Sequence, residues 1–445
     1  MIPSFGEAIR FWFGLGWMSF GGPAGQISLM HKTLVEEKQW ISEDRFSHAL
    51  SYCMLLPGPE AQQLATYLGW ILHGVKGGIF AGLLFILPSI LIFISISILY
   101  FSYGTVFYVI SFLNGVKPAV LAIVILAFSN LVLKGLKSKG HVFCFILTLT
   151  GMLFFGIPYP YLLGFSLIIG LVSFFVLKKE FQVEKTSPVS NISFGKIDIQ
   201  TNLEQKRDSN AKILKNLSQV GSIGLILWVL PLLGILLFQK SEFLFWKELI
   251  LFFTKTALIT FGGAYAILPT VSDFATSQAH WITTREMIDG LAFGESTPGP
   301  LVMVLTFIGF LAGAHRYTSI SAGLLGLFLT AYYTFLPSFI LILGGAKVVE
   351  KTKESPMFRI ILSYVTACVC GVILYLGIYF AKSILFVEGN NWGSFLQNPL
   401  SQIHWLSFVW TGISILFLRF KKKFSILWLF ASGLFFLGLD LIFHL

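Results

Sequence analysis

The stretch Phe20-Gly21-Gly22-Pro23 … Trp40-Ile41 … Leu56-Pro57-Gly58-Pro59 decides the fold, because the chain contains it twice. The second copy reads Phe261-Gly262-Gly263 … Trp281-Ile282 … Thr297-Pro298-Gly299-Pro300, with every anchor 241 positions after its counterpart. Further on, Leu87-Pro88-Ser89 matches Leu336-Pro337-Ser338 at an offset of 249. Such constant spacing indicates an internal duplication.

The composition is that of an all-α integral membrane protein. Of the 445 residues, 56% are hydrophobic and 12% charged, and the mean hydropathy is +0.80, whereas a soluble domain carries about 25% charged residues. Many apolar runs approach the roughly 20 residues that a membrane-spanning helix needs. Glu7 and Arg10 in the opening helix, without a cleavage-site pattern, predict that this helix is retained.

The net charge of +10 does not point to nucleic acid, because most Lys and Arg residues lie in short loops beside apolar runs. The cysteines lie in apolar segments without disulfide or zinc spacing, so we expect no metal site, although Cys368 and Cys370 have the spacing of a soft pair. We likewise expect no catalytic residues and no cofactor.

Glycine and proline predict discontinuous helices. Proline removes a backbone donor and glycine relaxes the chain, so the elements at 5–35 and 42–73 break at their Phe-Gly-Gly and Pro-Gly-Pro motifs. Spans are predicted near 77–101, 105–133, 139–156 and 160–178, which completes an N-terminal repeat over 1–178. A polar linker at 179–212 and a connecting span at 213–238 lead into a C-terminal repeat over 243–445. That repeat has broken helices at 252–278 and 285–314, then spans near 319–346, 358–383, 402–419 and 424–443.

Loop charge predicts the orientation. One alternating path of about thirteen membrane segments places all basic loops in the cytoplasm, with the N-terminus cytoplasmic and the C-terminus periplasmic. On this path the segment from 77 and its duplicate from 319 run in opposite directions. The two halves are therefore predicted to be inverted repeats, and whether the broken helices span or re-enter the membrane is left open.

Inverted repeats with discontinuous helices are a recurrent architecture of secondary transporters. A half-helix that begins inside the membrane presents unpaired N–H groups and a partly positive dipole end, which suit an anion. The alternative is that Gly and Pro only kink tightly packed helices. Four breaks in matched pairs favour the anion site.

The polar residues near the breaks differ between the copies. Glu60, Gln63 and Tyr67 share one helical face after the first Pro-Gly-Pro, whereas Glu295 and Thr297 precede the second.

Glu60 and Glu295 are candidate proton or coupling sites, because intramembrane carboxylates are costly and usually functional. Glu60 as a helix-start residue in a wet vestibule is the alternative.

Between the breaks, Ser42 and Thr283 are predicted helix caps, followed by Arg45 and Arg285, the best-placed cations for a dianion. Lys117 is expected to snorkel rather than to line the pathway. The candidate substrate-binding residues are Gly21, Gly22, Arg45, Pro57, Gly58, Pro59, Glu60, Gln63, Gly262, Gly263, Arg285, Glu295, Thr297, Pro298, Gly299 and Pro300.

The two motif copies, above all Leu-Pro-Gly-Pro-Glu-Ala-Gln-Gln-Leu-Ala-Thr-Tyr-Leu-Gly-Trp at 56–70, resemble the chromate transporter family in its long, two-domain form. The resemblance covers nearly the whole chain and implies thirteen spans, two homologous halves of opposite orientation, and chromate efflux across the bacterial inner membrane. It also implies a link to sulfate, the isostere of chromate. Short family members act as pairs of half-length chains, and a homodimer of this chain is left open. The apolar Leu301 and an eight-residue insertion make the transfer of site residues less secure in the second half.

We therefore expect a secondary transporter that exports a tetrahedral oxyanion, most readily chromate, and is not an enzyme. An anion channel, or a carrier of another anionic or lipid-linked substrate, is the alternative, followed by a membrane-embedded enzyme. The chain contains no G-x-x-x-x-G-K-[ST] phosphate-binding motif, which argues against a self-contained ATP-driven pump.

Overall fold

Both motifs interrupt helices where the sequence predicts it. The structure, a computed structural model, describes residues 3–20, 22–54, 56–177, 210–238, 240–261, 264–349, 356–386, 403–421 and 424–443. These residues form helices and turns, and their β-pairing is limited to one isolated bridge between Phe386 and Ile403. The all-α class is confirmed.

The first half contains the segments α1 (Phe5–Met18), α2 (Gly22–His31), η1 (Lys32–Glu37), α3 (Glu43–Cys53), α4 (Glu60–Tyr103), α5 (Phe107–Gly135), α6 (Lys139–Phe155) and α7 (Tyr159–Leu177). A kink at His73 and Gly74, which leave helical backbone angles, divides α4 where one predicted span gives way to the next. The helix α8 (Asn210–Phe238) follows as the connecting span. Most of the predicted linker lies outside the described residues.

The second half contains η2 (Lys240–Glu242), α9 (Phe243–Ile259), α10 (Ala264–Asp273), η3 (Phe274–Gln278), α11 (Thr284–Ser296), η4 (Leu301–Met303), α12 (Val304–Tyr317), α13 (Ile320–Val349), α14 (Pro356–Leu385), α16 (Trp405–Phe420) and α17 (Ser425–Phe443). Within the described residues, six helices are long and apolar enough to cross a membrane: Glu60–Tyr103, Phe107–Leu133, Leu217–Phe238, Ile320–Gly345, Ile360–Leu385 and Ser425–Phe443. Shorter apolar helices accompany them, so this is a multi-pass membrane protein. The count of thirteen stays a prediction.

Local geometry repeats with the sequence. The backbone N–H of Trp40 donates to the Leu34 carbonyl at 2.9 Å, and the N–H of Trp281 donates to the Ala275 carbonyl at 2.8 Å. Before each tryptophan stands a non-glycine residue with positive φ, Gln39 at 52° and His280 at 50°. At the offset of 241, the backbone conformation is therefore repeated as well as the sequence.

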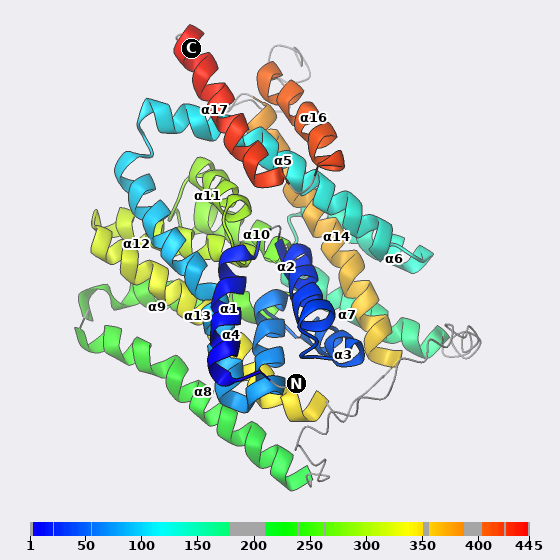
Figure 1. Cartoon of the computed structure of the whole chain (residues 1–445). Helices are drawn as coiled ribbons and strands as arrows, with labels where there is room; N and C mark the ends of the chain where they lie inside the picture. Colours follow the sequence, from blue (N-terminus) through cyan, green and yellow to red (C-terminus); the bar gives the residue numbers. More distant parts are fainter. Residues whose placement is uncertain are drawn as a thin grey trace.

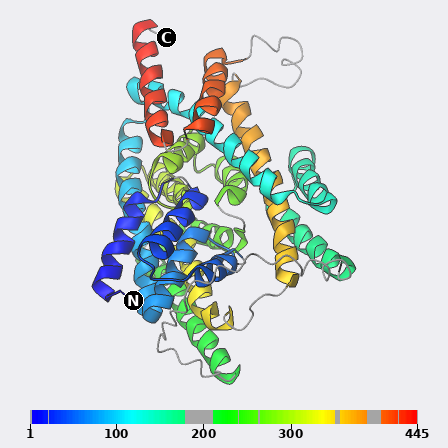
Figure 2. The ribbon, with the colours of Figure 1, turned by 45° about the vertical axis from the view of Figure 1, so that its right-hand side comes forward.

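The two halves are interlocked rather than side by side (Figures 1 and 2). The helix α4 packs against α1 of its own half and against α12 and α13 of the other half. The helix α13 also packs against α9. On the other flank the exchange is reciprocal: α6 and α7 pack against α14, and α16 and α17 pack against α5. Helices of each half therefore pack against a helix of the other half.

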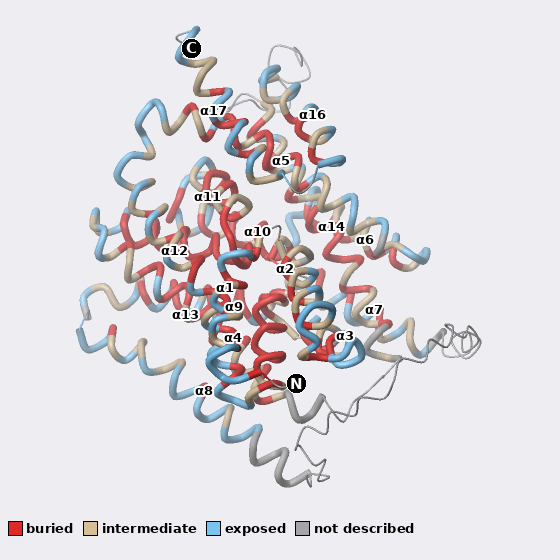
Figure 3. Tube along the Cα trace, in the orientation of Figure 1, coloured by how far each residue is buried: buried red, intermediate tan, exposed pale blue. Residues whose placement is uncertain are grey.

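Burial follows this arrangement, with buried residues concentrated where the halves cross and exposed residues along the outer helices (Figure 3). The helix α8 carries many exposed apolar side chains, among them Ile223, Leu225, Ile226 and Leu230. Exposed apolar side chains along a span are what a helix facing lipid requires.

Candidate functional site

The Pro-Gly-Pro loop of each half reaches the Phe-Gly-Gly break of the other half. The N–H of Gly58 donates to the carbonyl of Thr260 at 2.7 Å, and the N–H of Gly299 donates to the carbonyl of Ser19, also at 2.7 Å. Ser19 and Thr260 are the C-cap residues of α1 and α9. The two bonds are counterparts at the offset of 241, so the four interruptions form two equivalent crossings.

Glycine is required at both crossings. Gly58 has φ of +129° and Gly299 has φ of +102°, in the region that side chains rarely adopt. A Cβ on Gly58 would collide with the Ser338 hydroxyl, and a Cβ on Gly299 would collide with the Ser89 hydroxyl. The repeated serines therefore pack directly on the loop glycines of the opposite half.

Polar side chains complete each crossing differently. At one, Ser89 Oγ donates to the Pro298 carbonyl at 2.5 Å, and Gln26 Nε2 donates to the Gly299 carbonyl at 2.5 Å and to the Ser19 carbonyl at 3.2 Å. At the other, Gln63 Nε2 donates to the Pro57 carbonyl at 2.7 Å and lies 3.5 Å from Ser338 Oγ. The side chain of Gln63 therefore lies at the break, and its predicted contact with substrate stays a prediction.

Half-helices begin at these crossings as the motifs predict. Pro59 is the N-cap of α4, whose first residue is Glu60, and Pro300 precedes the turn η4 that leads into α12. The helix α2 begins at Gly22, which has φ of +68°. The first N–H groups of a helix have no intrahelical partner, and the helix dipole makes that end partly positive. Gly21, Gly262 and Gly263 lie outside the described residues.

The two candidate carboxylates have different surroundings. Glu60 and Glu295 are both partly buried. Tyr265 in the first turn of α10 donates a hydrogen bond to Glu295, whereas Thr297 donates its hydroxyl to the Phe293 carbonyl of its own helix at 2.8 Å. Glu295 is therefore tied to the half-helix that starts after the second Phe-Gly-Gly break.

The two arginines lie apart from the crossings. Arg45 is exposed at the start of α3, and Arg285 Nε lies 3.8 Å from Asp289 Oδ2. Among the described contacts, neither arginine bonds a residue of a break. Substrate contact by these arginines stays a prediction.

The helix starts between the breaks differ in their capping. Thr283 forms a capping box with Glu286, while Ser42 occupies the N-cap of α3 without the predicted side-chain bond. Predicted capping is thus confirmed in full only for the second copy.

The prediction that Lys117 snorkels is wrong. Its Nζ lies 3.1 Å from Oδ1 of the fully buried Asp289, and only 12% of its side chain is exposed. A buried carboxylate that needs a counter-ion holds the ammonium inside the protein, which sequence position alone did not indicate.

A cavity of about 1030 Å³ opens beside the second break. Its walls come from α9, α10, α14 and the start of α7, and they include Lys247, Lys255, Ile259 and Asp273. Tyr159, which also lines the cavity, donates its hydroxyl to the Phe261 carbonyl at 3.2 Å. Tyr159 therefore links the wall of the cavity to the Phe-Gly-Gly break, and this cavity was not predicted from the sequence.

Several residues of the crossings escaped the sequence analysis. Ser89 and Ser338 were visible as a repeated Leu-Pro-Ser motif, which could have been read as part of the site. Gln26 has the apolar Ile267 as its counterpart, so the repeat offered no signal for it.

Discontinuous helices that meet inside a multi-pass α-helical protein recur in membrane transporters. The sequence model of the family described as chromate transporter matches residues 6–171 and 247–437, and the chain belongs to that family. The resemblance inferred from the motifs is thereby confirmed.

Relatives share most of their length with this chain. A chromate transport protein of Cupriavidus metallidurans is 27% identical over 84% of this chain and 82% of its own. A chromate transport protein of Pseudomonas aeruginosa is 29% identical over 81% of this chain and 77% of its own. An uncharacterized transporter of Methanocaldococcus jannaschii is 25% identical over 82% of both chains. No solved structure matches.

Proposed function

We propose that this chain is a secondary transporter that exports chromate across a bacterial inner membrane. Membership of the chromate transporter family and two relatives named chromate transport proteins support the substrate. The observation that carries the mechanism is the pair of reciprocal bonds, Gly58 to Thr260 and Gly299 to Ser19, each 2.7 Å long.

The crossings suit a tetrahedral oxyanion for a physical reason. Each reciprocal bond satisfies one carbonyl at the end of a half-helix. The N–H groups at the start of the next half-helix remain as donors for an anion, without a full positive charge buried in the membrane. Chromate and sulfate both present four oxygens to such donors.

The cavity beside the second break supplies the approach. Lys247 and Lys255 on α9 line it, and basic side chains at the mouth of a pathway raise the local concentration of an anion. Because Glu248 and Asp273 also line the cavity, the lysines attract the anion without creating a site that retains it. We infer that the substrate passes from this cavity to the Phe261 break.

Export follows from the membrane potential. A cytoplasm-negative potential drives a dianion outward by about 2.3 kcal/mol per charge per 100 mV. The exchange of accessible faces would come from the two interlocked halves, which we propose to be inverted repeats over 1–178 and 243–445.

The test is uptake of labelled chromate into everted membrane vesicles, in competition with sulfate and phosphate. Everted vesicles that contain the protein should take up chromate saturably, with sulfate competing better than phosphate. Uptake that does not exceed that of vesicles without the protein would refute the proposal. Flux that rises linearly with concentration would indicate a channel instead.

A further inference from the structure

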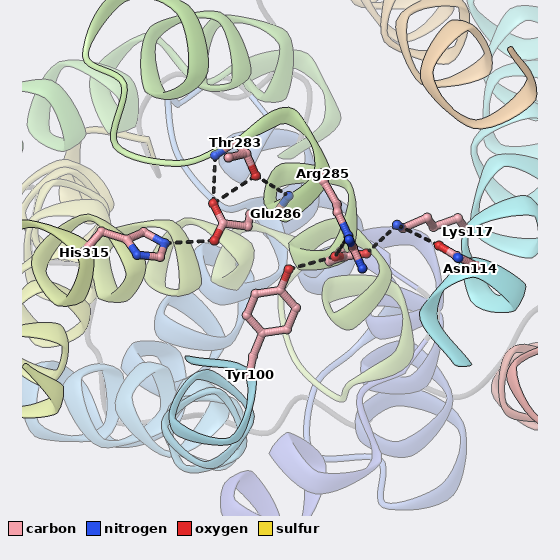
Figure 4. Close-up of polar contacts among 8 residues, drawn as sticks. Tyr100, Asn114, Lys117, Thr283, Arg285, Glu286 and His315 are labelled. Carbon is pink, nitrogen blue, oxygen red and sulfur yellow. Dashed lines mark hydrogen bonds and ion pairs between the residues drawn. The ribbon is translucent and has the colours of Figure 1, made fainter. Parts of the chain in front are cut away.

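Away from the crossings, a cluster of charged and polar side chains surrounds Asp289. Lys117 Nζ lies 3.1 Å from Asp289 Oδ1, Arg285 Nε lies 3.8 Å from Oδ2, and the Tyr100 hydroxyl donates to Oδ2 at 2.8 Å. Figure 4 shows Tyr100, Lys117 and Arg285 converging from α4, α5 and α11. We name these four residues the Asp289 cluster.

The cluster joins the two halves of the chain. Lys117 and Tyr100 belong to the first half, whereas Asp289 and Arg285 are on α11 in the second. Next to Lys117, an apolar group packs Val116, Ala119 and Val120 of α5 with Ala292 of α11 and Leu429 of α17. An ion pair in such surroundings fixes a direction and a register that apolar packing would leave adjustable.

Neighbouring polar groups are already engaged. Asn114 Oδ1 accepts from Lys117 Nζ at 3.3 Å. Glu286, also on α11, lies 2.8 Å from His315 of α12 and caps Thr283 (Figure 4). The Asp289 carboxylate is fully buried, so Lys117 and Arg285 are its charge partners in the described part of the chain.

The repeat-equivalent positions do not carry this cluster. At the offset of 241, Asp289 corresponds to His48 and Arg285 to Asp44, and at the offset of 249 Lys117 corresponds to Thr366. The equivalent helix α3 instead has an exposed hydrogen bond between Glu43 and His31 of its own half, at 2.6 Å. The duplicated halves are therefore held unequally.

The cluster lies on the helix that positions the second Pro-Gly-Pro loop. The helix α11 leads directly into Thr297-Pro298-Gly299-Pro300, so its placement sets the placement of Gly299 against Ser19. In transporters built from repeats, exchange between the two faces of the membrane moves one repeat against the other. The Lys117–Asp289 pair lies between the halves and has no counterpart at the repeat-equivalent positions, so such an exchange would form it in one arrangement and separate it in the other.

We propose that Lys117 and Asp289 are positioning residues that hold α11, and with it the second Pro-Gly-Pro loop, in one of two arrangements. The pair forms when the loop closes on Ser19 and separates when the loop withdraws. This inference rests on the proposed alternating transport and adds the residues that set its balance.

The test measures exposure of the loop without any substrate. Thr297, only 9% exposed, is replaced by Cys, and its reaction with a membrane-impermeant maleimide is followed in purified protein. The four native cysteines are all buried, so the new thiol is the reporter. Lys117→Met and Asp289→Asn should each accelerate labelling about tenfold, because a separated pair releases α11. Lys117→Arg and Asp289→Glu keep the charges and should label slowly.

The double variant Lys117→Met/Asp289→Asn should label no faster than the faster single variant, because both remove the same pair. Asp440→Asn in α17 is the matched carboxylate control and should label like the parent. Equal labelling of Asp289→Asn and its parent would overturn the proposal, as would charge-retaining variants that label as fast as the neutral ones. The labelling assay uses no chromate, so its result can be interpreted even if the protein is found not to transport chromate.

Discussion

Replacing Gly299 with Ala tests the crossing at its most crowded point. The residue has φ of +102°, and its new Cβ would collide with Ser89 Oγ and lie 2.8 Å from Ser89 Cβ. Ser89 is fully buried, and its hydroxyl donates to the Pro298 carbonyl at 2.5 Å, so it cannot move aside without losing that bond.

Three terms set the magnitude. A side chain in a sparsely populated backbone region costs about 1–3 kcal/mol. Overpacking of a closely packed site costs about 1–3 kcal/mol, and the displaced serine hydrogen bond costs about 1 kcal/mol. We therefore expect Gly299→Ala to lower the free energy of unfolding by about 3–7 kcal/mol.

The assay is a double-mutant cycle with Ser89→Gly, read by denaturant unfolding of the purified protein. Ser89→Gly removes both colliding atoms, so the steric term disappears in the double variant while the backbone term remains. Both single variants also lose the Ser89 hydrogen bond, so the double variant should be more stable than the sum of the single effects by about 2–4 kcal/mol.

Gly164→Ala in α7 is the control, because a Cβ there meets nothing within 4 Å. Additive single effects, or a Gly299→Ala protein as stable as the parent, would refute the reasoning.

Three further predictions concern transport and topology. Gly22→Leu should abolish chromate flux while the protein still inserts, because φ of +68° excludes leucine although no neighbour lies within 4 Å of the added Cβ; wild-type flux in everted vesicles would contradict this. Glu60→Gln should remove most of the pH dependence of flux while substrate affinity is retained, since an intramembrane carboxylate at the start of α4 is a candidate proton carrier. An unchanged pH profile would leave Glu60 as a helix-start residue. A reporter fused after Lys185 should be cytoplasmic and one at Leu445 periplasmic, and two reporters on the same side would refute the inverted repeat.

The sequence was most informative where glycine and proline act locally. Gly22, Gly58 and Gly299 all have positive φ, and the helix interruptions fall at the motifs that contain them. Repeat offsets also located the equivalent turns before Trp40 and Trp281. Such features depend on the backbone preferences of single residues, which follow directly from the residue type.

Contacts between distant segments could not be predicted in the same way. The amino-acid sequence does not indicate that the N–H of Gly58 donates to Thr260 rather than to a residue of its own half. That partner depends on how the two halves pack together. Lys117 has a long flexible side chain compatible with snorkelling, and only the placement of Asp289 on a packed helix excludes it. The charged cluster has no counterpart in the other repeat, so the duplication that revealed the crossings could not reveal it.

Exchange of labelled chromate in proteoliposomes loaded with unlabelled chromate tests the crossed breaks most directly. The purified protein should accumulate label above empty liposomes, and Gly164→Ala should match it, since no atom lies within 4 Å of the added Cβ. Gly58→Ala and Gly299→Ala should each lose most of this exchange, because both place a Cβ against a serine of the opposite half. Exchange no greater than in empty liposomes, or undiminished exchange in both loop variants, would contradict the account.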